Sequence, residues 1–385
     1  MQVTLFANVL PQFNPYIALL RQAVQPHCEA IVTVRPRFTP DWVYRYGKAG
    51  SIAHIHWIES HINPRHWFEP DASGYRYLIN RLGNNRLSHP ARATGLLVKL
   101  AVALALARRT GVPVVYTVHN LTAHHHNNSY YAYLERLANR LIFVWANAVH
   151  VHSHETVQAI ARSYGRTRNV FVAPHGNYIG WYSNTVTRAE ARLHLSLPGD
   201  TFVYLSLGQI APYKGLEELV EAFVALGDPA ARLIIAGKVA HADYSARMAT
   251  ITQHPHILYL PDFVPDHKIQ IYFNAADIVV LPYQRITTSG SALLAFSFGR
   301  PVIAPALGAL SEFVPSPVGL LYPPHERGAL TSALCRAQSI SWSSQVILAH
   351  ARQFDWHTIG SQIANIYRTV LLTPEAAVSS RKEHV

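Results

Sequence analysis

Twelve short apolar runs alternate with helical segments along the chain, and this alternation restricts the fold more than any other feature. The strand-like runs of the first half cover residues 3–10, 29–36, 51–58, 112–120, 147–153 and 170–176. Those of the second half cover residues 202–209, 231–238, 256–263, 277–283, 301–306 and 319–324. Apolar strands that alternate with helices are typical of parallel sheets covered on both faces. Twelve strands exceed one compact sheet, so we predict an α/β fold of two doubly wound domains.

The polar stretch TVTRAEARLHLSLPGD at residues 185–200 is the predicted boundary between these domains, because it ends in Pro-Gly-Asp. The expected domains are therefore residues 1–185 and residues 186–354. A length of 385 residues is enough for two ordinary cores, and apolar residues make up 49% against 14% charged residues, which excludes a disordered chain.

Several features indicate a cytoplasmic protein. Cys28 and Cys335 lie in opposite halves, which argues against a disulfide framework and fits a reducing compartment. The N-terminus MQVTLFANVL resembles a strand and not a signal peptide. The apolar stretch at residues 95–109 is interrupted by Lys99, and we expect it to be too short to span a bilayer.

The positive charge belongs to the first half of the chain. Residues 1–180 contain 18 Lys and Arg against 7 Asp and Glu, whereas residues 181–385 contain 15 of each. This asymmetry favours an anionic membrane surface as a partner, with a merely solvated basic surface as the alternative. No nucleic-acid-binding motif accompanies the charge, so nucleic acid is not an expected partner. We expect a cytoplasmic chain that is either dissolved or peripheral on the inner face of the cell membrane.

Polar residues follow the predicted strands, and ligands of open parallel sheets bind beyond the carboxyl ends of strands. Lys214 begins an amphipathic helix after the run 202–209 and is predicted to bind a diphosphate, or else to point into water. Thr287–Ser291 leads into an apolar helix, whose first turn either binds an anion or is simply capped by Thr288 or Ser289. Two such places in one domain predict a diphosphate ligand.

Four segments of the second half resemble, in order and spacing, the bacterial glycosyltransferases with the GT-B fold: LGQIAPYKGLEELVEAF, LIIAGK, YFNAADIVVLPY and SFGRPVIAPALGALSEFV. The first half contains HIHW, YTVHN, HVHS and PHGNY where that group has similar signatures. The chain is most similar to the large group that includes many retaining nucleotide-sugar hexosyltransferases, which is glycosyltransferase family 4-like. The resemblance covers nearly the whole chain and implies two Rossmann-like domains that face each other across a cleft. It also implies that the last helix, about residues 355–373, returns to the first domain.

The resemblance implies transfer of a hexose from a UDP- or GDP-linked sugar to a glycan or glycolipid acceptor, such as a lipid-linked intermediate of a surface glycan or exopolysaccharide. No metal and no further cofactor is implied. A nucleotide-sugar epimerase of the same fold and a non-catalytic partner subunit are the alternatives. The implied donor-binding residues are Gly208, Gln209, Lys214, Gly237, Lys238, Phe263, Val264, Thr288, Ser289, Gly290 and Ser291.

Lys214 and His119 are the predicted catalytic residues. The resemblance places His119 beside the reacting sugar, where it either donates a hydrogen bond to the hexose or helps to deprotonate the acceptor. A purely structural histidine is the alternative. The predicted acceptor-binding residues are Asn14, His56, Asn120 and His175.

The chain departs from the group at two places. Ile286 and Leu294 stand where many members have paired glutamates, which leaves both a retaining and an inverting outcome open. Gln209 and Ala211 stand where relatives often have an arginine. Either activity is weak, or Arg285 or Arg300 supplies the missing charge to the leaving diphosphate.

Two further segments are expected to act on the acceptor side. His124-His125-His126 is predicted to be an acceptor-side loop and not a metal site, because adjacent histidines seldom point at one ion. The segment 65–86 mixes basic and aromatic side chains, which indicates either a lipid interface or an ordinary surface helix. Its members are Arg65, His66, Trp67, Phe68, Arg76, Tyr77, Arg81 and Arg86.

Overall fold

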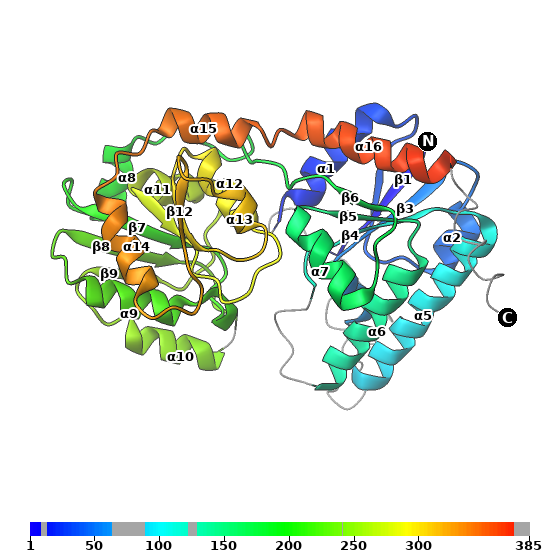
Figure 1. The fold of residues 1–385 in the computed structure, drawn as a ribbon, viewed down its shortest axis with the longest axis horizontal. Helices are drawn as coiled ribbons and strands as arrows, with labels where there is room; N and C mark the ends of the chain where they lie inside the picture. Colours follow the sequence, from blue (N-terminus) through cyan, green and yellow to red (C-terminus); the bar gives the residue numbers. More distant parts are fainter. Residues whose placement is uncertain (9–13, 64–88, 122–128, 241, 373–385) are drawn as a thin grey trace, which may run out of the picture. The chain divides into compact units, whose positions relative to one another are not determined.

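The computed structural model describes residues 1–8, 14–63, 89–121, 129–240 and 242–372. They divide into two compact units (Figure 1). Unit 1 comprises Met1–Pro174 and Trp356–Val385, and unit 2 comprises His175–Asp355. Each unit is built on a six-stranded sheet whose paired strands run parallel. The predicted fold of two parallel-sheet α/β domains is therefore confirmed.

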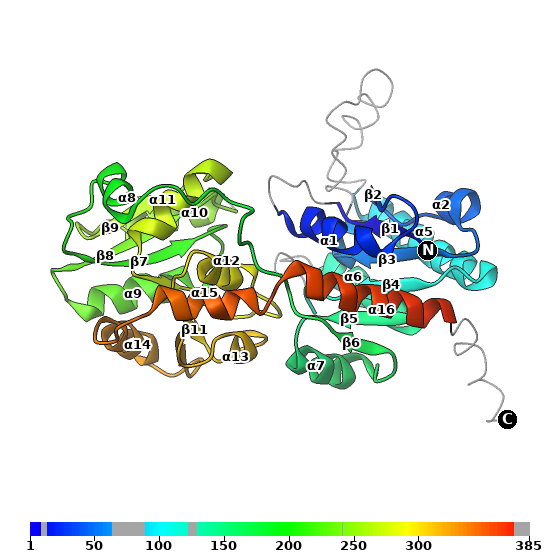
Figure 2. The ribbon, with the colours of Figure 1, turned by 90° about the horizontal axis from the view of Figure 1, so that it is seen from above.

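The sheet of unit 1 has the strand order β2-β1-β3-β4-β5-β6. Its strands are β1 (Gln2–Phe6), β2 (Thr33–Arg35), β3 (Ser51–His56), β4 (Val114–Thr117), β5 (Ala148–Val151) and β6 (Val170–Val172). Helices flank this sheet (Figure 2). They are α1 (Tyr16–Val24), α2 (Pro40–Tyr46), α3 (Ile58–Ile62), α5 (His89–Thr110), α6 (Ser129–Trp145), α7 (His154–Tyr164) and α16 (Trp356–Leu372).

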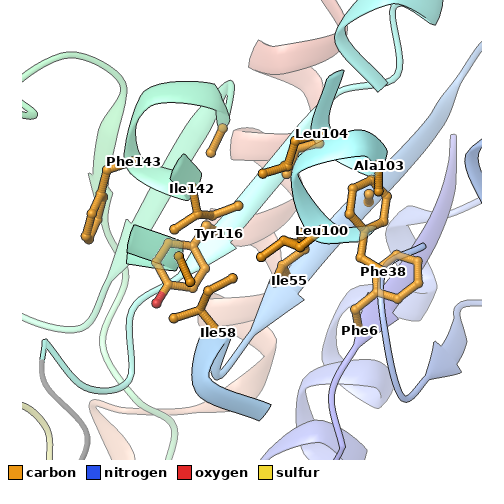
Figure 3. Close-up of a cluster of buried hydrophobic side chains, with 14 of the residues drawn as sticks. Phe6, Phe38, Ile55, Ile58, Leu100, Ala103, Leu104, Tyr116, Ile142 and Phe143 are labelled. Carbon is orange, nitrogen blue, oxygen red and sulfur yellow. The ribbon is translucent and has the colours of Figure 1, made fainter. Parts of the chain in front are cut away.

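The two faces of this sheet differ in polarity. On one face, Ile55 of β3 and Tyr116 of β4 pack against Leu100 and Leu104 of α5 in a buried apolar cluster (Figure 3). Side chains alternate between faces along a strand. The neighbours of these residues therefore point to the opposite face, where His54, in β3, is hydrogen-bonded to Tyr367 of α16.

Helix α5 is longer than the sequence indicated. The expectation that it is too short to span a bilayer is wrong, because the helix runs from His89 to Thr110 and is long and apolar enough to do so. The prediction failed because the helix extends N-terminally through Pro90, which is tolerated in the first turn. A periodic stripe of α5 lies in the core of unit 1, as expected for a core helix. This stripe consists of Ala93, Leu97, Leu100, Ala103, Leu104 and Ala107.

The sheet of unit 2 has the strand order β12-β11-β10-β7-β8-β9. Its strands are β7 (Phe202–Leu207), β8 (Ala231–Ala236), β9 (Ile257–Leu260), β10 (Ile278–Val280), β11 (Val302–Pro305) and β12 (Gly319–Tyr322). One face is covered by α9 (Leu216–Leu226), α10 (Ala242–Ile251) and α14 (Ala329–Gln338). The remaining helices are α8 (Arg188–His194), α11 (Asp266–Ala275), α12 (Gly290–Ser297), α13 (Leu310–Phe313) and α15 (Ser344–Arg352).

The domain boundary lies earlier than the predicted residue 185. Residues 175–185 bond to unit 2: the Asn177 amide donates to the Phe354 carbonyl at 2.8 Å, and the Tyr178 amide donates to Ser297 Oγ at 2.9 Å. The stretch predicted as the boundary contains α8, whose start is closed by a capping box between Thr187 and Glu190. These hydrogen bonds explain why the chain divides after Pro174.

Helix α16 packs on α1 through a glycine. A Cβ atom at residue 360 would lie 2.3 Å from the Ala23 carbonyl oxygen. Gly360→Val should therefore lower the free energy of unfolding by about 2–3 kcal/mol in urea denaturation, as overpacking does. Gly95→Ala, in α5, is the matched control, because a Cβ there meets nothing within 4 Å. It should raise stability by up to about 1 kcal/mol, and equal effects of both variants would contradict the packing argument.

Candidate active site

Each unit contains two neighbouring strands whose following helices lie on opposite faces of the sheet. Ligands of open α/β sheets bind at the carboxyl ends of such a pair of strands. In unit 2, the chain after β7 enters α9 and the chain after β10 enters α12, on the other face. In unit 1, the chain after β1 enters α1, whereas the chain after β3 enters α3. The candidate residues lie at the carboxyl ends of these strands.

Lys214 lies at the carboxyl end of β7, in a short turn, Pro212–Lys214, that packs directly on the end of β10. The next residue, Gly215, has a φ of +68°, and a Cβ there would lie 2.0 Å from the Pro282 carbonyl oxygen. This contact brings the Lys214 Nζ atom to the Tyr283 hydroxyl, to which it donates at 3.0 Å. Both side chains line a small pocket together with Ser206–Ile210.

Tyr283 is a site residue that the sequence reasoning missed. Burial lowers the pKa of Lys214, but Tyr283 and Tyr213 outweigh it and hold that pKa above its ordinary value. Burial likewise raises the pKa of Tyr283, whereas Lys214 and hydrogen bonds with Ser291 and Ser289 bring it below its ordinary value. The Tyr283 hydroxyl thus connects the lysine to the start of α12. Its only sequence signal was its place at the end of the predicted run 277–283.

Ser289 is the N-cap of α12, since its Oγ accepts a hydrogen bond from the Ala292 amide at 3.3 Å. Among the described residues, the buried Thr288 Oγ1 has no hydrogen-bond partner. A Cβ at Gly290 would lie 2.8 Å from the Tyr178 hydroxyl and 3.4 Å from His175 Nε2. His175 was assigned to the acceptor domain, and this is wrong. It lies in unit 2 beside the start of α12, because residues 175–185 belong to that unit.

The other predicted donor residues follow β7, β8 and β9 on the same edge of the sheet. Gly208 and Gly237 have φ values of +135° and +140°, and a Cβ on Gly237 would lie 1.9 Å from the Gly208 carbonyl oxygen. Gln209 and Lys238 are exposed on these two loops. Phe263 is exposed and Val264 half-buried in the loop after β9. The structure brings this set to one edge of unit 2.

Arg300 does not supply the missing loop charge. It precedes β11 and so lies at the amino end of that strand, opposite the phosphate loops of a parallel sheet. There its guanidinium donates to Asn274 Oδ1 at 3.3 Å, and burial lowers its pKa to about 10. Arg285 follows β10 and is exposed. Of the two expected substitutes, only Arg285 lies at the correct edge.

His119 lies at the carboxyl end of β4 in unit 1, in an aromatic setting. Its Nε2 is 3.0 Å from His56 Nδ1, and its ring stacks on Trp57 with centroids 3.9 Å apart. The Tyr16 ring meets it edge-on at 4.9 Å, and His152 lies 5.4 Å away between centroids. The structure therefore brings together two predicted residues, His119 and His56, with three aromatic side chains that the sequence reasoning did not select.

A buried polar row runs across the sheet beneath His119. The His54 Nδ1 is 2.6 Å from the Tyr367 hydroxyl, and its Nε2 is 2.6 Å from Thr117 Oγ1. Thr117 Oγ1 is 2.8 Å from His150 Nδ1, and His150 Nε2 is 2.9 Å from the Ala173 carbonyl oxygen. Burial lowers the pKa of His150 to about 4, so it is neutral. Since a carbonyl only accepts, His150 carries its hydrogen on Nε2 and accepts from Thr117.

Thr117→Val removes the hydroxyl from the middle of this row. Two buried nitrogens, His54 Nε2 and His150 Nδ1, then lose their hydrogen-bond partner. Each unsatisfied buried group costs about 1–3 kcal/mol, so we expect a fall in the free energy of unfolding of about 2–6 kcal/mol. Urea denaturation measures it. Thr250→Val is the matched control, since its hydroxyl donates to the Ala246 carbonyl at an exposed position of α10. A loss no larger than the control's would contradict the account of the row.

The other predicted acceptor residues are Asn14 and Asn120. Asn14 Oδ1 accepts from the Tyr16 amide at 3.0 Å and so fixes the start of α1. Asn120 is hydrogen-bonded to the Glu59 carboxyl, whose pKa burial raises to about 7 with a further contribution from Glu135. Sequence reasoning missed Glu59 because a single acidic residue in a short helix carries no signal. A carboxyl with this pKa is half ionised near neutrality.

Two predicted segments, His124-His125-His126 and Arg65 to Arg86, lie outside the described residues. Within the described ranges, no group of three or more His, Cys, Asp or Glu side chains is arranged to hold a metal ion.

Two family models match the chain, one in each unit. Residues 96–177 match the model described as Glycosyltransferase Family 4, and residues 201–339 match the one described as Glycosyl transferases group 1. A GDP-mannose:glycolipid 4-beta-D-mannosyltransferase from Xanthomonas campestris pv. campestris is 28% identical over 93% of this chain and 88% of that protein. The chain belongs to the GT-B-fold glycosyltransferases.

Solved structures agree with the fold of this glycosyltransferase. A sucrose-phosphate synthase from Thermosynechococcus elongatus has a TM-score of 0.66 at 18% identity, covering 97% of this chain and 99% of that one. HepE from Anabaena, in complex with UDP, has a TM-score of 0.64 at 19% identity, covering 96% and 99%. The predicted family and its transferase activity are thus confirmed, and the roles of individual residues stay predictions.

Proposed function

We propose that this glycosyltransferase moves a mannosyl unit from GDP-mannose to a glycolipid acceptor. The observation that carries the proposal is the hydrogen bond from Lys214 to Tyr283, at the carboxyl ends of β7 and β10 and beside the start of α12. A fixed cation near unpaired helix amides favours a diphosphate. The choice of donor and acceptor is supported by two Xanthomonas campestris relatives, both named GDP-mannose:glycolipid 4-beta-D-mannosyltransferase, at 29% and 28% identity.

In the proposed reaction, an acceptor hydroxyl attacks the anomeric carbon of mannose while the bond from that carbon to the phosphate oxygen breaks, and the proton of the hydroxyl is released to solvent. Lys214 stabilises the charge that collects on the departing GDP, and the first amides of α12 bind its distal phosphate. The Xanthomonas relatives are named for a β-linked product, which from an α-linked donor requires inversion. A single displacement of this kind forms no enzyme-bound sugar, which agrees with Ile286 in place of a glutamate.

Calorimetric titration of the purified chain with GDP, UDP and ADP tests the donor. The proposal expects clear binding of GDP and weaker binding of the other two. Preferential binding of UDP would show that the donor is a UDP-linked sugar and not GDP-mannose. Binding of none of the three nucleotides would overturn the proposed site.

We also propose that the chain works on the cytoplasmic face of an anionic membrane, which it contacts through the exposed sides of α5 and α6. Helix α5 contains no Asp or Glu, and the one acidic residue of α6, Glu135, is buried. The exposed residues instead combine apolar and cationic side chains, a composition that suits an anionic lipid surface. They include Val98, Lys99, Val102, Tyr133, Arg136, Arg140 and Val144. We call this set the α5–α6 surface.

The double variant Arg136→Glu/Arg140→Glu tests the α5–α6 surface in sedimentation with phosphatidylglycerol vesicles. Each cation near such a surface contributes about 1 kcal/mol, so the double variant should bind at least about 30-fold more weakly. Arg162→Glu/Arg168→Glu is the matched control, since it changes the net charge of unit 1 equally at exposed positions outside α5 and α6. Equal losses in both double variants would contradict a localised surface.

A further inference from the structure

His56 and His119 form a hydrogen-bonded pair, and their surroundings determine which of the two histidines donates the hydrogen. The contact joins His56 Nδ1 to His119 Nε2 at 3.0 Å, so one nitrogen donates and the other accepts. His56 is fully buried, and burial together with the nearby histidines His54, His119, His150 and His152 holds its pKa well below the ordinary value. His56 is therefore neutral and carries one hydrogen.

The other nitrogen of His56 shows where that hydrogen is. Among the described residues, His56 Nε2 is buried and has no hydrogen-bond partner. If His56 carried its hydrogen there, a buried N–H would be left unpaired, which is rarer in proteins than an unpaired buried acceptor. If the hydrogen is on Nδ1 instead, it is used in the contact with His119. The second arrangement is the more stable one, so His56 donates and His119 Nε2 accepts.

The surrounding side chains keep the two rings in this arrangement. Trp57 stacks on His119 with an angle of 10° between the ring planes, and the Tyr16 ring meets the same histidine edge-on at 89°. Trp57 has a φ of +47°, a left-handed conformation that is strained for a bulky residue. Such strain persists only where its surroundings enforce it, and it is often associated with function. Here the strained backbone holds the indole over the His119 ring.

We infer that His56 fixes the tautomer of His119, so that His119 carries its hydrogen on Nδ1 and acts as a hydrogen-bond donor and not as a base. A neutral histidine has one acceptor nitrogen, and His56 already occupies that of His119. His56 is thus a positioning residue for His119. The consequence for turnover rests on the proposed function, since it assumes that His119 faces the reacting sugar. The tautomer itself does not depend on that assumption.

Nitrogen-15 NMR of histidine-labelled protein at mildly alkaline pH tests the tautomer, with the His119 signals assigned by their absence in His119→Asn. The wild type should show His119 with the hydrogen on Nδ1. His56→Leu, which offers no donor, should return His119 to the Nε2–H form that predominates in water. His56→Asn should keep the Nδ1–H form, because the asparagine amide nitrogen replaces the Nδ1 donor. If His56→Leu does not fold, His56→Gln replaces it, since its amide reaches the position of Nε2 instead.

Steady-state rates with GDP-mannose provide the second measurement. His56→Leu should lower kcat/KM by about 10- to 100-fold, the effect of one misplaced polar hydrogen bond, and His56→Asn should recover most of it. An Nε2–H form of His119 in the wild type, or an unchanged tautomer in His56→Leu, would overturn the inference. Absence of turnover together with the expected tautomers would instead count against the proposed function alone.

Discussion

Replacing Lys214 by methionine is expected to lower kcat by about 10²- to 10³-fold, the cost of losing one preorganised charge on a leaving group. Methionine has nearly the length of lysine but no charge, so the change isolates the ammonium. The structure makes this lysine hard to replace: Arg300 lies at the opposite edge of the sheet, and neither Gln209 nor Ala211, in the loop after β7, carries a charge. The affinity for GDP should fall as well, by about 10- to 100-fold.

Steady-state kinetics and GDP titration of the same preparation check this expectation. Lys268→Met is the matched control, since Lys268 is exposed on α11 in the same unit. It should behave as the wild type does. A Lys214→Met enzyme within about twofold of the wild type would exclude Lys214 from the diphosphate site.

Gly237→Ala is expected to lower the free energy of unfolding by more than about 4 kcal/mol, or to abolish nucleotide binding in any protein that folds. The methyl group would lie 1.9 Å from the Gly208 carbonyl oxygen, and a backbone atom cannot rotate away as a side chain can. The loops after β7 and β8 would therefore have to separate. Those loops contain most of the predicted donor residues, so the damage should be both structural and functional.

Gly208→Ala is the matched control for this variant. Both glycines have similar φ values, +135° and +140°, but a Cβ on Gly208 meets nothing within 4 Å. The control should lose about 1–3 kcal/mol from backbone strain alone. Urea denaturation followed by tryptophan fluorescence measures both. Equal losses would mean that the close approach of the two loops does not matter.

The fold was predictable because its signal is repeated. Each strand of a parallel sheet is buried on both faces, and its sequence is therefore a continuous apolar run. The strands found among the described residues fall inside the predicted runs, for example β3 within residues 51–58 and β8 within residues 231–238, except that β1 begins one residue before its run, at Gln2. A single ambiguous run matters little in such a series, since the order of elements determines the class of fold.

Boundaries were less predictable, because they depend on tertiary contacts. The polar composition of residues 185–200 is that of a linker, yet Arg188 and Arg192 of α8 there bond to Asp277 at 2.6 and 2.8 Å. Similarly, residues 175–185 lack helix or strand periodicity and are assigned to unit 2 only by hydrogen bonds such as that from Thr185 to Gln270. Composition does not reveal partners that are distant in sequence.

The candidate site shows the same division between local and tertiary information. Lys214 and Ser289 were found because helix starts have a local sequence signal. Tyr283 was missed, since its role arises from a lysine 69 positions earlier in the chain. In HIHW and HVHS the alternating histidines marked one face of the sheet, but the pairing of His56 with His119 depends on the register of β3 and β4.

The central claim is transfer of mannose from GDP-mannose to a lipid-linked acceptor. The most direct measurement incubates the chain with radiolabelled GDP-mannose, with and without a polyprenyl diphosphate oligosaccharide, and extracts the lipid. The account predicts that label enters the organic phase only when the acceptor is present. Conversion of the GDP-sugar without any acceptor would indicate an epimerase. Label that stays aqueous and unchanged across a range of acceptors, together with no binding of GDP, would contradict the account.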